Sequence, residues 1–425
     1  MPGAERPCAP ASIRIESQRR LRILYLHQHY SRPTGSTATR SYLQARALAE
    51  AGHAVTLACG RYRGAETGLG GPFRHGRRTG APDGFEVVEC DIPCANAQSL
   101  SARSLGFLRY AAAASRLALG APWDLVVASS TPLTVALPAL LARRRRGTPF
   151  LFEIRDPWPE LPRVLSAQGG GVPGPVLAAM EPLADAACRR AAAVVALTEG
   201  MAETALARGA DPRRMRVLPQ GADLDLFGPH VLPWRPDGVA ADDVLAVYAG
   251  AHGVANGLGQ LLDAAALLRG SSLRLLLVGD GACKPALVAR AAAEGLPIRF
   301  LDPMPKPRLA ALLAGTQIGL LCLAAVPAFA ELSAPNKLAE GLAAGLPMVS
   351  NVPGRAARLL AQGEAGVTVP PGDAAALAAA LRALAGDPAR RAKMGRAARH
   401  LAERRLDAQR IARDFVEMAE QAAAG

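Results

Sequence analysis

A chain of 425 residues exceeds the size at which one hydrophobic core keeps growing, so the sequence predicts two domains of about 200 residues each. Half of the residues are hydrophobic and 20% are charged, which is typical of a globular protein. The net charge of +13 indicates partners that carry phosphate, and these include nucleotides, nucleic acid and an anionic membrane surface.

The cysteines and the apolar segments exclude further classes. Seven cysteines are scattered without a CxxC pair or zinc-type spacing, so neither a disulfide framework nor a structural metal is expected, and a reducing cytoplasm fits. Residues 1–20 carry charges but no apolar core, which predicts a disordered tail and not a signal peptide. Two apolar runs, 125–142 and 309–330, are punctuated by Pro, Gly, Ser or Thr, so each is expected to divide into a strand and a helix.

In chain order, the first half alternates buried strands with helices. Residues 22–30, 36–51 and 54–60 predict a strand, a helix and a strand, which is a βαβ unit, and residues 61–84 predict a long loop. Further strands are expected at 84–90, 124–130, 149–154, 192–198 and 215–218, with helices at 100–119, 132–146, up to 191 and at 200–208.

The second half repeats this scheme after a segment rich in Pro and Gly. Strands are expected at 244–250, 273–281, 298–302, 317–323 and 348–352, with helices between them and a helical tail from 374. We predict an α/β fold of two doubly wound Rossmann-like domains that face each other across a cleft. The predicted boundaries are a tail at 1–20, an N-terminal domain at 21–218, a linker at 219–240, a second domain at 241–400 and a C-terminal helix at 401–425.

The segment SAPNKLAEGLAAGLP, Ser333 to Pro347, predicts a phosphate site at a helix start. Ser333 is the expected N-cap and Pro335 suits the first turn. Lys337 and Glu340 are three residues apart, so both project from one side of that turn, where free N–H groups and the helix dipole favour an anion. A solvated surface pair is the alternative interpretation of the same spacing.

Two glycine-rich turns in the second half also predict close approach of the backbone to a phosphate. GAHGVANGL, from Gly250, places three glycines between a strand and a helix, and His252 could donate a hydrogen bond or be an exposed loop residue. GDGACK, which ends at Lys284, is near to a dinucleotide fingerprint, with Asp302 about 20 residues beyond its start. Lys284 occupies the third glycine position, which argues against NAD and leaves a general nucleotide site.

Charged residues follow the strand at 149–154, where ligands bind in an open parallel sheet. Arg155 and Asp156 are therefore candidate site residues, although helix caps and salt bridges are common in such positions. The segment from Asp223 to Asp225 looks like a metal-binding carboxylate pair, but its place in the linker favours a structural role. No metal is assigned, and no GxxxxGK[ST], HExxH or GxSxG signature is present.

The order and the amino-acid sequences of these segments resemble a known family over about residues 22–420. The matching segments are SSTPLTVALPALLARRRRGTPFLFEIRDPWPE, QGADLDLF, YAGAHGVANGL, LVGDGACKPAL, SAPNKLAEGLAAGLPMV and DPARRAKMGRAAR. Together they resemble the retaining glycosyltransferases of family 4, with WbuB-type enzymes of bacterial surface-polysaccharide assembly as the nearest branch. The resemblance implies the two-domain GT-B fold.

The resemblance also implies roles for individual residues. Lys337 would contact the phosphates of the sugar donor and Glu340 its ribose, while residues 302–304 would hold the base. Gly35 and Ser36 would approach the diphosphate from the other domain. The donor-binding residues implied in the same way, or by the turns that contain them, are Gly250, His252, Gly253, Asn256, Lys284, Asp302, Ser333, Pro335 and Asn336.

The implied catalytic residues depart from the family pattern. Asp156 falls where many relatives carry a His-Asp pair near the donor sugar, and Arg155 replaces the His. Glu331 would be the partner of Glu340, although their spacing is one residue longer than that of the usual pair. Ala251 and Asn256 stand where many members carry Arg and Lys. The catalytic candidates are therefore Asp156, Arg155 and Glu331.

The expected reaction moves a sugar from a nucleoside diphosphate, UDP ahead of GDP, to an acceptor hydroxyl with retention and without a metal or other cofactor. A polyprenyl-diphosphate-linked saccharide is the expected acceptor. Arg143 to Arg146 predict peripheral contact of this cytoplasmic protein with the anionic inner face of the plasma membrane, or simply a solvated helix end. Alternatives are a nucleotide-sugar epimerase, an NAD-linked enzyme and a non-catalytic nucleotide- or nucleic-acid-binding protein. Nucleic acid is not expected because no aromatic stacking pattern or recognition-helix motif is present.

Overall fold

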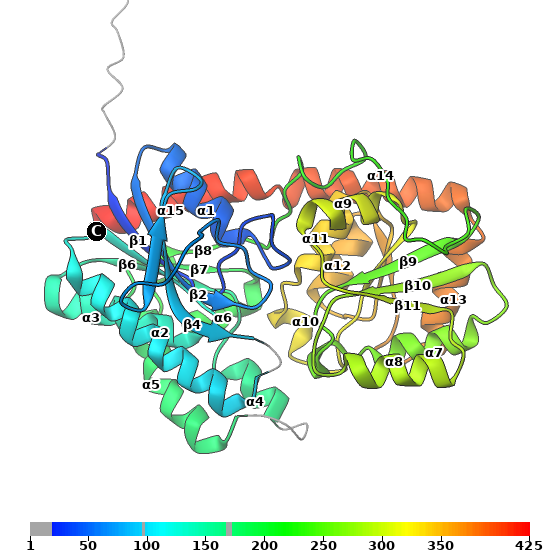
Figure 1. Cartoon of the computed structure of the whole chain (residues 1–425), viewed down its shortest axis with the longest axis horizontal. Coiled ribbons are helices and arrows are strands. Elements are labelled where there is room, and N and C mark those ends of the chain that lie inside the picture. The colour runs from blue at the N-terminus through cyan, green and yellow to red at the C-terminus, as the bar shows by residue number, and fades with distance from the viewer. Residues whose placement is uncertain (1–18, 96–97, 167–171) are drawn as a thin grey trace, which may run out of the picture.

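The computed structural model describes residues 19–95, 98–166 and 172–425, so nearly all of the predicted N-terminal tail lies outside it. Two α/β domains lie side by side along the long axis of the molecule, and each is an open sheet with helices on both faces (Figure 1). The expected fold of two doubly wound Rossmann-like domains is therefore confirmed.

The N-terminal domain is an eight-stranded sheet of order β3-β4-β2-β1-β5-β6-β7-β8. Leu24 of β1 lies opposite Thr56 of β2 and Val126 of β5, so the first strand is central and parallel to both neighbours. The elements are β1 Arg22–Leu26, α1 Arg40–Glu50, β2 Ala54–Tyr62, β3 Arg77–Gly80, β4 Glu86–Cys94, α2 Leu100–Gly120, β5 Leu125–Ser129, η1 Leu133–Val135, α3 Ala136–Arg146, β6 Phe150–Ile154, α4 Glu160–Ser166, α5 Gly174–Arg190, β7 Ala193–Ala196, α6 Glu199–Ala207, η2 Pro212–Arg214 and β8 Met215–Val217.

The C-terminal domain is a six-stranded, fully parallel sheet of order β11-β10-β9-β12-β13-β14. Its elements are β9 Val244–Ala249, η3 Val254–Asn256, α7 Gly259–Leu267, β10 Leu273–Val278, α8 Lys284–Ala293, β11 Ile298–Leu301, α9 Lys306–Ala314, β12 Ile318–Leu321, α10 Phe329–Leu332, α11 Asn336–Ala343, β13 Met348–Ser350, α12 Arg355–Gln362, β14 Gly366–Thr368, α13 Ala374–Ala385 and α14 Pro388–Arg405. The last helix, α15 Ala408–Ala424, packs on the other domain.

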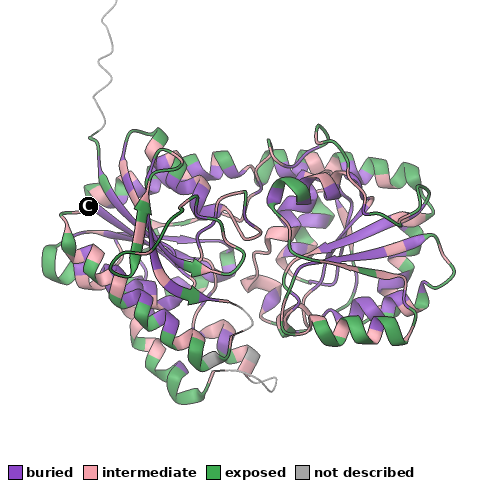
Figure 2. Cartoon of the chain, in the orientation of Figure 1, coloured by how far each residue is buried: buried purple, intermediate pink, exposed green. Residues whose placement is uncertain are grey.

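Both faces of each sheet are buried, which explains why the strands read as continuous apolar runs. Leu24 and Leu26 pack into one core of the N-terminal domain, while Ile23 and Tyr25 face the core on the opposite side. Figure 2 shows the strands of both domains as buried and the outer faces of the helices as exposed. The alternation along β1 therefore produces two helix-covered layers, and only the carboxyl ends of the strands remain open to a ligand.

Two strands were missed, β3 and the short edge strand β14. Residues 61–84 were predicted as a loop, but β3 pairs antiparallel with β4 at the edge of the sheet, with Thr79 opposite Val88. Its sequence, RRTG, has no apolar alternation, and its pairing is supported instead by Arg78, whose Nε lies 2.8 Å from a carboxylate oxygen of Glu89. Such an edge strand is formed by tertiary contacts that periodicity does not reveal.

The chain crosses between the domains twice, and the two crossings lie side by side. Ala222 donates to the carbonyl of Leu406 at 2.8 Å and accepts from Ala408 at 3.0 Å. Beyond this point α15 buries Phe415 in the N-terminal domain, against Tyr25. The helical tail expected from residue 374 consists of α13, α14 and α15, and the boundary placed at residue 400 falls inside α14.

The two apolar runs divide as predicted. Residues 125–142 contain β5, η1 and the start of α3, and residues 309–330 contain part of α9, β12 and the start of α10. Among the residues that the structure describes, no helix is both long enough and apolar enough to span a bilayer.

Candidate active site between the two domains

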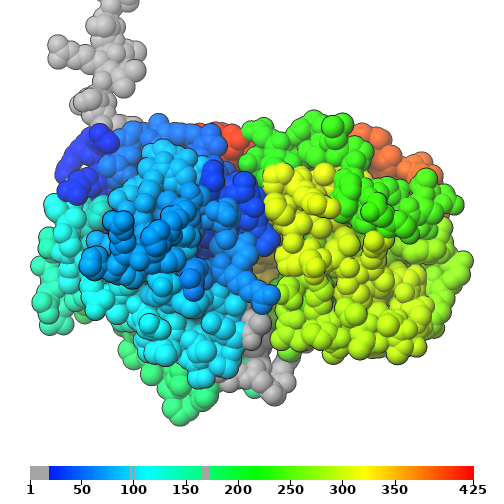
Figure 3. Space-filling model, in the orientation of Figure 1, coloured from blue at the N-terminus to red at the C-terminus, as the bar shows by residue number. Residues whose placement is uncertain are grey.

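A cleft of about 1010 Å³ separates the carboxyl ends of the strands of the two domains. Figure 3 shows the two halves of the chain meeting along this seam. Among the described residues, contacts between the domains beside the cleft include Lys306 N–H donating to the carbonyl of Pro33 at 3.1 Å, the Thr198 hydroxyl donating to the carbonyl of Glu331 at 2.8 Å, and an ion pair of Arg355 with Glu199 at 3.3 Å. Both faces of the cleft are thus held in one arrangement.

Lys337 is the central cation of the C-terminal face. Its Nζ donates to the Tyr248 hydroxyl at 2.8 Å and to Oδ1 of Asn256 at 2.9 Å, and it lies 4.3 Å from the centre of the tyrosine ring. Among the described residues, no carboxylate forms an ion pair with it, and burial lowers the pKa of the ammonium to about 8. One ammonium hydrogen remains for a ligand, so this lysine is an uncompensated cation at the wall of the cleft.

Glu340 does not pair with Lys337. Its Oε1 accepts from Nζ of Lys306, and both side chains are nearly inaccessible, with 10% and 8% exposure. Glu340 and Lys306 both line the cleft, so the other carboxylate oxygen is available to a ligand there. The solvated Lys337–Glu340 surface pair is therefore excluded, and Lys306 is a site residue that the sequence analysis missed.

The start of α11 differs from the prediction. Ser333 is not the N-cap, because its hydroxyl donates to the carbonyl of Phe329 at 2.6 Å and so caps the end of α10. Pro335 is the N-cap residue and Asn336 begins the helix. All three residues nevertheless line the cleft, and the free N–H groups of this first turn face the same space as Lys337.

The glycine-rich turns form the floor between β9 and β10. A side chain at Gly250 would place its Cβ 2.8 Å from Cε of Lys337, and one at Gly279 would lie 1.9 Å from the carbonyl oxygen of Gly250. Only glycine fits at these two positions, and both line the cleft. His252 and Gly253, predicted to bind the donor, do not line it; His252 is fully buried, and burial with the charge of Lys284 lowers its pKa to about 4.

Lys284 is used within the domain and not in the cleft. Its Nζ donates to the carbonyl of Gly279 at 2.9 Å and to Oδ1 of Asp302 at 2.7 Å, so it ties the ends of β10 and β11 together. Lys284 does not line the cleft, which contradicts its predicted contact with the leaving group. Asp302, Pro303 and Met304 do line it, in the place where the resemblance puts the base.

The loop after β1 brings the N-terminal domain to the same space. Ser36 lines the cleft, but its N–H and its hydroxyl both donate to the carbonyl of Gly64, at 2.9 and 3.0 Å. Gly35 is packed beneath, where a Cβ would lie 2.3 Å from the hydroxyl oxygen of Ser31, and does not line the cleft. Thr37 lines it instead, with a buried hydroxyl that has no partner.

Arg155 and Asp156 both line the opposite wall. Nη1 of Arg155 donates to Nε2 of His27 at 2.7 Å, and Nδ1 of His27 lies 2.8 Å from the Ser41 hydroxyl. Burial, followed by the charge of Arg155, lowers the pKa of His27 well below its usual value, so the ring is neutral and accepts from the guanidinium. Asp156 accepts from the Thr131 hydroxyl at 2.6 Å, which leaves its other oxygen free to contact a substrate.

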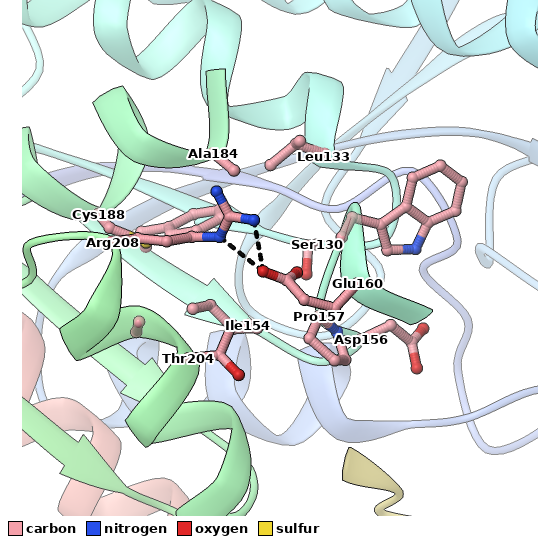
Figure 4. A pocket seen from close by; sticks show the side chains of 13 residues that line it. Ser130, Leu133, Ile154, Asp156, Pro157, Glu160, Ala184, Cys188, Thr204 and Arg208 are labelled. Atoms are coloured by element: carbon pink, nitrogen blue, oxygen red, sulfur yellow. Dashed lines mark hydrogen bonds and ion pairs between the residues drawn. The ribbon is translucent and has the colours of Figure 1, made fainter. Parts of the chain in front are cut away.

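A smaller pocket lies behind Asp156. Figure 4 shows the Asp156 carboxylate pointing away from Arg208, which pairs with Glu160. Arg208 also lies 2.7 Å from carboxylate oxygens of Glu181 and Asp185. The carboxylates of this cluster are therefore paired with Arg208. Asp156, in contrast, faces the interdomain cleft.

Glu331 is a correction to the predicted catalytic set. Its two oxygens accept from Arg358 at 2.9 and 2.7 Å, so the carboxylate is held in a bidentate pair outside the cleft. Its backbone packs on the N-terminal domain, where a Cβ at Gly200 would lie 2.9 Å from it. The extra residue in its spacing from Glu340 is the sequence feature that already separated it from the family pattern.

The structure also brings together residues that the sequence analysis did not single out. His27, His29, Tyr62, Arg63 and Thr131 line the N-terminal wall. The sequence signal for them was their position, because Tyr62, Arg63 and Thr131 follow predicted strands and the two histidines lie in the last part of the strand predicted at 22–30. Among the described residues, no group of three or more His, Cys, Asp or Glu side chains is placed to hold a metal ion.

Two Rossmann-like domains facing a cleft with this arrangement define a GT-B fold. The solved structure of sucrose-phosphate synthase from Thermosynechococcus elongatus has a TM-score of 0.71 to this chain, is 19% identical and covers 94% of this chain and 98% of its own. The Anabaena protein HepE in complex with UDP and glucose has a TM-score of 0.66, is 19% identical and covers 94% and 99%.

Sequence comparison gives the family. The model of the glycosyl transferase 4-like domain matches residues 35–221, and that of glycosyl transferases group 1 matches residues 243–387, so together they cover well over half of the chain. The chain belongs to the family 4 glycosyltransferases. A D-inositol 3-phosphate glycosyltransferase from Kribbella flavida is 32% identical over 205 residues, which are 45% of this chain and 47% of the relative. The match thus spans about half the length of this curated relative.

Proposed function

We propose that the chain transfers a sugar from a nucleoside diphosphate sugar, UDP ahead of GDP, to an acceptor hydroxyl with retention at the anomeric carbon. The observation that carries the proposal is the uncompensated ammonium of Lys337 at the cleft wall, beside two glycines that leave room for phosphate and a helix start that attracts it. The UDP in the complex of the similarly folded HepE supports UDP as the nucleotide. Retention is proposed from the resemblance to the retaining enzymes.

The C-terminal face would act on the leaving group. As the bond between the sugar and the diphosphate breaks, negative charge grows on the phosphate oxygens, and a positioned cation stabilises that charge more in the transition state than in the bound donor. Lys337 and the N–H groups at the start of α11 supply this stabilisation, and Glu340 holds the ribose hydroxyls. The proposal needs no metal ion or other cofactor for this step.

The N-terminal wall would position the acceptor. Asp156 has one carboxylate oxygen free, so it can accept a hydrogen bond from a sugar hydroxyl near the reacting carbon. Arg155, held by neutral His27, keeps a positive charge beside it. Closure of the two domains over the substrates would exclude water and so limit hydrolysis of the donor.

The first test is a nucleotide screen by thermal shift. UDP, as the proposed nucleotide, is expected to stabilise the protein most. A ligand at 100 times its Kd adds about 2.7 kcal/mol to the free energy of unfolding, so its binding should raise the melting temperature measurably. GDP and NAD are the comparison ligands. A transfer assay with and without acceptor then separates a transferase from an epimerase, since an epimerase converts the donor alone. Absence of a shift with every nucleoside diphosphate would contradict the proposal.

A lipid-linked saccharide is the proposed acceptor, reached by peripheral contact with the anionic inner face of the plasma membrane. Arg143 to Arg146 form the last turn of α3, and in the described part of the chain none of them pairs with a carboxylate. On the neighbouring helix α2, Leu105 and Leu108 are 58% and 56% exposed. These leucines lie near the start of α2, whereas Nη2 of Arg146 donates to the carbonyl of Leu119 at its other end, so the arginines alone carry the proposed attraction to an anionic bilayer surface.

This contact predicts binding to vesicles that contain phosphatidylglycerol. At roughly 1 kcal/mol per charge, the double variant Arg144→Gln and Arg145→Gln should bind about 30-fold more weakly at low salt. The matched control is Arg390→Gln with Arg396→Gln, which removes two exposed charges from α14 of the other domain. Co-sedimentation measures both. Equal losses of vesicle binding in the two double variants would show that the net charge of the protein, and not the arginines of α3, causes the binding.

A further inference from the structure

The N-terminal wall of the cleft carries positive charges that are not paired with any carboxylate the structure describes. Arg63 and Arg155 line it and Arg103 lies beside it on α2, and in the described part of the chain none of the three forms an ion pair with a carboxylate. The nearby buried carboxylate, Glu153, is already paired with Arg40 at 2.8 Å. Arg155 is therefore the surplus cation of this buried group.

Arg103 and Arg155 lie near one aromatic surface of this wall, and Arg63, next to it in the chain, lines the cleft. The rings of His29 and Tyr62 lie 4.7 Å apart and both line the cleft. Arg63 follows Tyr62 directly, and its N–H donates to the carbonyl of Cys94 at 2.9 Å, which fixes the end of β2 against the end of β4. Arg103 reaches the same place from the first turn of α2, with its guanidinium 5.9 Å from the centre of the Phe107 ring.

The pKa of His29 is consistent with the charges of Arg155 and Arg103 lying near this surface. Burial, then Arg155 and then Arg103 lower its pKa to about 3, so the ring is neutral at physiological pH. Arg103 also acts on Tyr62 and Cys94. Arg103 and Arg155 are half-buried and Arg63 is exposed. Half-buried guanidinium groups that lack a counter-charge are costly, and a bound anion would remove that cost.

We propose that Arg63, Arg103 and Arg155 form a subsite for a phosphate or diphosphate group carried by the acceptor. Guanidinium groups bind phosphate through paired, charge-assisted hydrogen bonds, and a neutral histidine and a tyrosine add a donor and an acceptor without opposing charge. This inference rests on the proposed function, but it concerns a different wall from Lys337. The donor phosphates and the acceptor phosphate would thus be held by different domains.

The test measures binding of two phosphate probes to protein saturated with UDP, so that the donor site is filled. Geranyl diphosphate represents a lipid-linked acceptor and glucose 6-phosphate a soluble one, with glucose as the neutral control. Isothermal titration calorimetry at fixed ionic strength compares wild type with Arg63→Gln and Arg103→Gln. Each variant should weaken the preferred phosphate probe about tenfold or more and leave UDP affinity unchanged.

The matched control is Arg116→Gln, which removes the same charge from an exposed position further along α2. It should bind both probes as wild type does. Tighter binding of geranyl diphosphate would identify a lipid-linked acceptor, and tighter binding of glucose 6-phosphate a soluble one. Failure of both probes while UDP binds, or equal weakening in Arg116→Gln, would overturn the subsite. Failure of UDP itself would instead refute the proposed function, and the same titrations without nucleotide would then decide the subsite alone.

Discussion

Replacing Glu340 with Ala is expected to lower kcat/KM for the sugar donor by about 100-fold and to destabilise the protein at the same time. The first effect follows from the loss of charge-assisted hydrogen bonds to the ribose, each worth roughly 1.5–3 kcal/mol. The second follows from Lys306, which is 7% exposed and would keep an unpaired charge. Breaking a buried pair from one side costs roughly 3–5 kcal/mol.

The double variant Glu340→Ala with Lys306→Met separates the two effects. It removes the orphaned ammonium, so stability measured by chemical denaturation should recover most of the loss, while donor use stays low. Lys306→Met alone should be destabilised, because it leaves the carboxylate unpaired. Recovery of donor turnover in the double variant would show that Glu340 acts through stability and does not hold the ribose.

This coupled behaviour could not be predicted from the sequence. The helical spacing in the sequence places Lys337 beside Glu340 and gives no sign of a buried partner whose loss would affect stability. Lys306 is 34 positions away and lies on a different helix, so only the packing of α9 against α11 reveals the pair. The bidentate contact of Glu331 with Arg358 is another tertiary pairing of this kind.

Local sequence patterns gave correct predictions where a feature depends on a single strand or turn. The buried strands, the glycines between β9 and β10 and the position of Asp156 after β6 follow from periodicity and chain order, because strand ends of a parallel sheet meet at one edge. The N-cap was misplaced at Ser333 since both it and Pro335 suit a helix start. Lys284 was misassigned because a lysine near a glycine turn can equally bind backbone carbonyls, as it does here.

Replacing Lys337 with Met is expected to lower kcat by about 100- to 1000-fold, because it removes the cation aimed at the departing diphosphate. Lys284→Met is the matched control: the same substitution in the same domain removes a lysine that is paired with Asp302 and does not line the cleft. Its kcat should stay within about threefold of wild type. Similar losses in both variants would show that the general positive charge of the domain, and not Lys337, stabilises the leaving group.

Titration of Lys337 is expected to be visible in the pH dependence of kcat/KM and of kcat. Burial lowers the pKa of its ammonium to about 8 in the free protein, so the charge is present below that pH and is lost above it. The kcat/KM for the donor, which reports groups of the free enzyme, should therefore fall as the pH rises through about 8. A bound diphosphate stabilises the ammonium, so the fall in kcat should occur at higher pH than the fall in kcat/KM. Lys337→Met should lack this limb in both profiles, and an unchanged limb in that variant would assign the titration to another group.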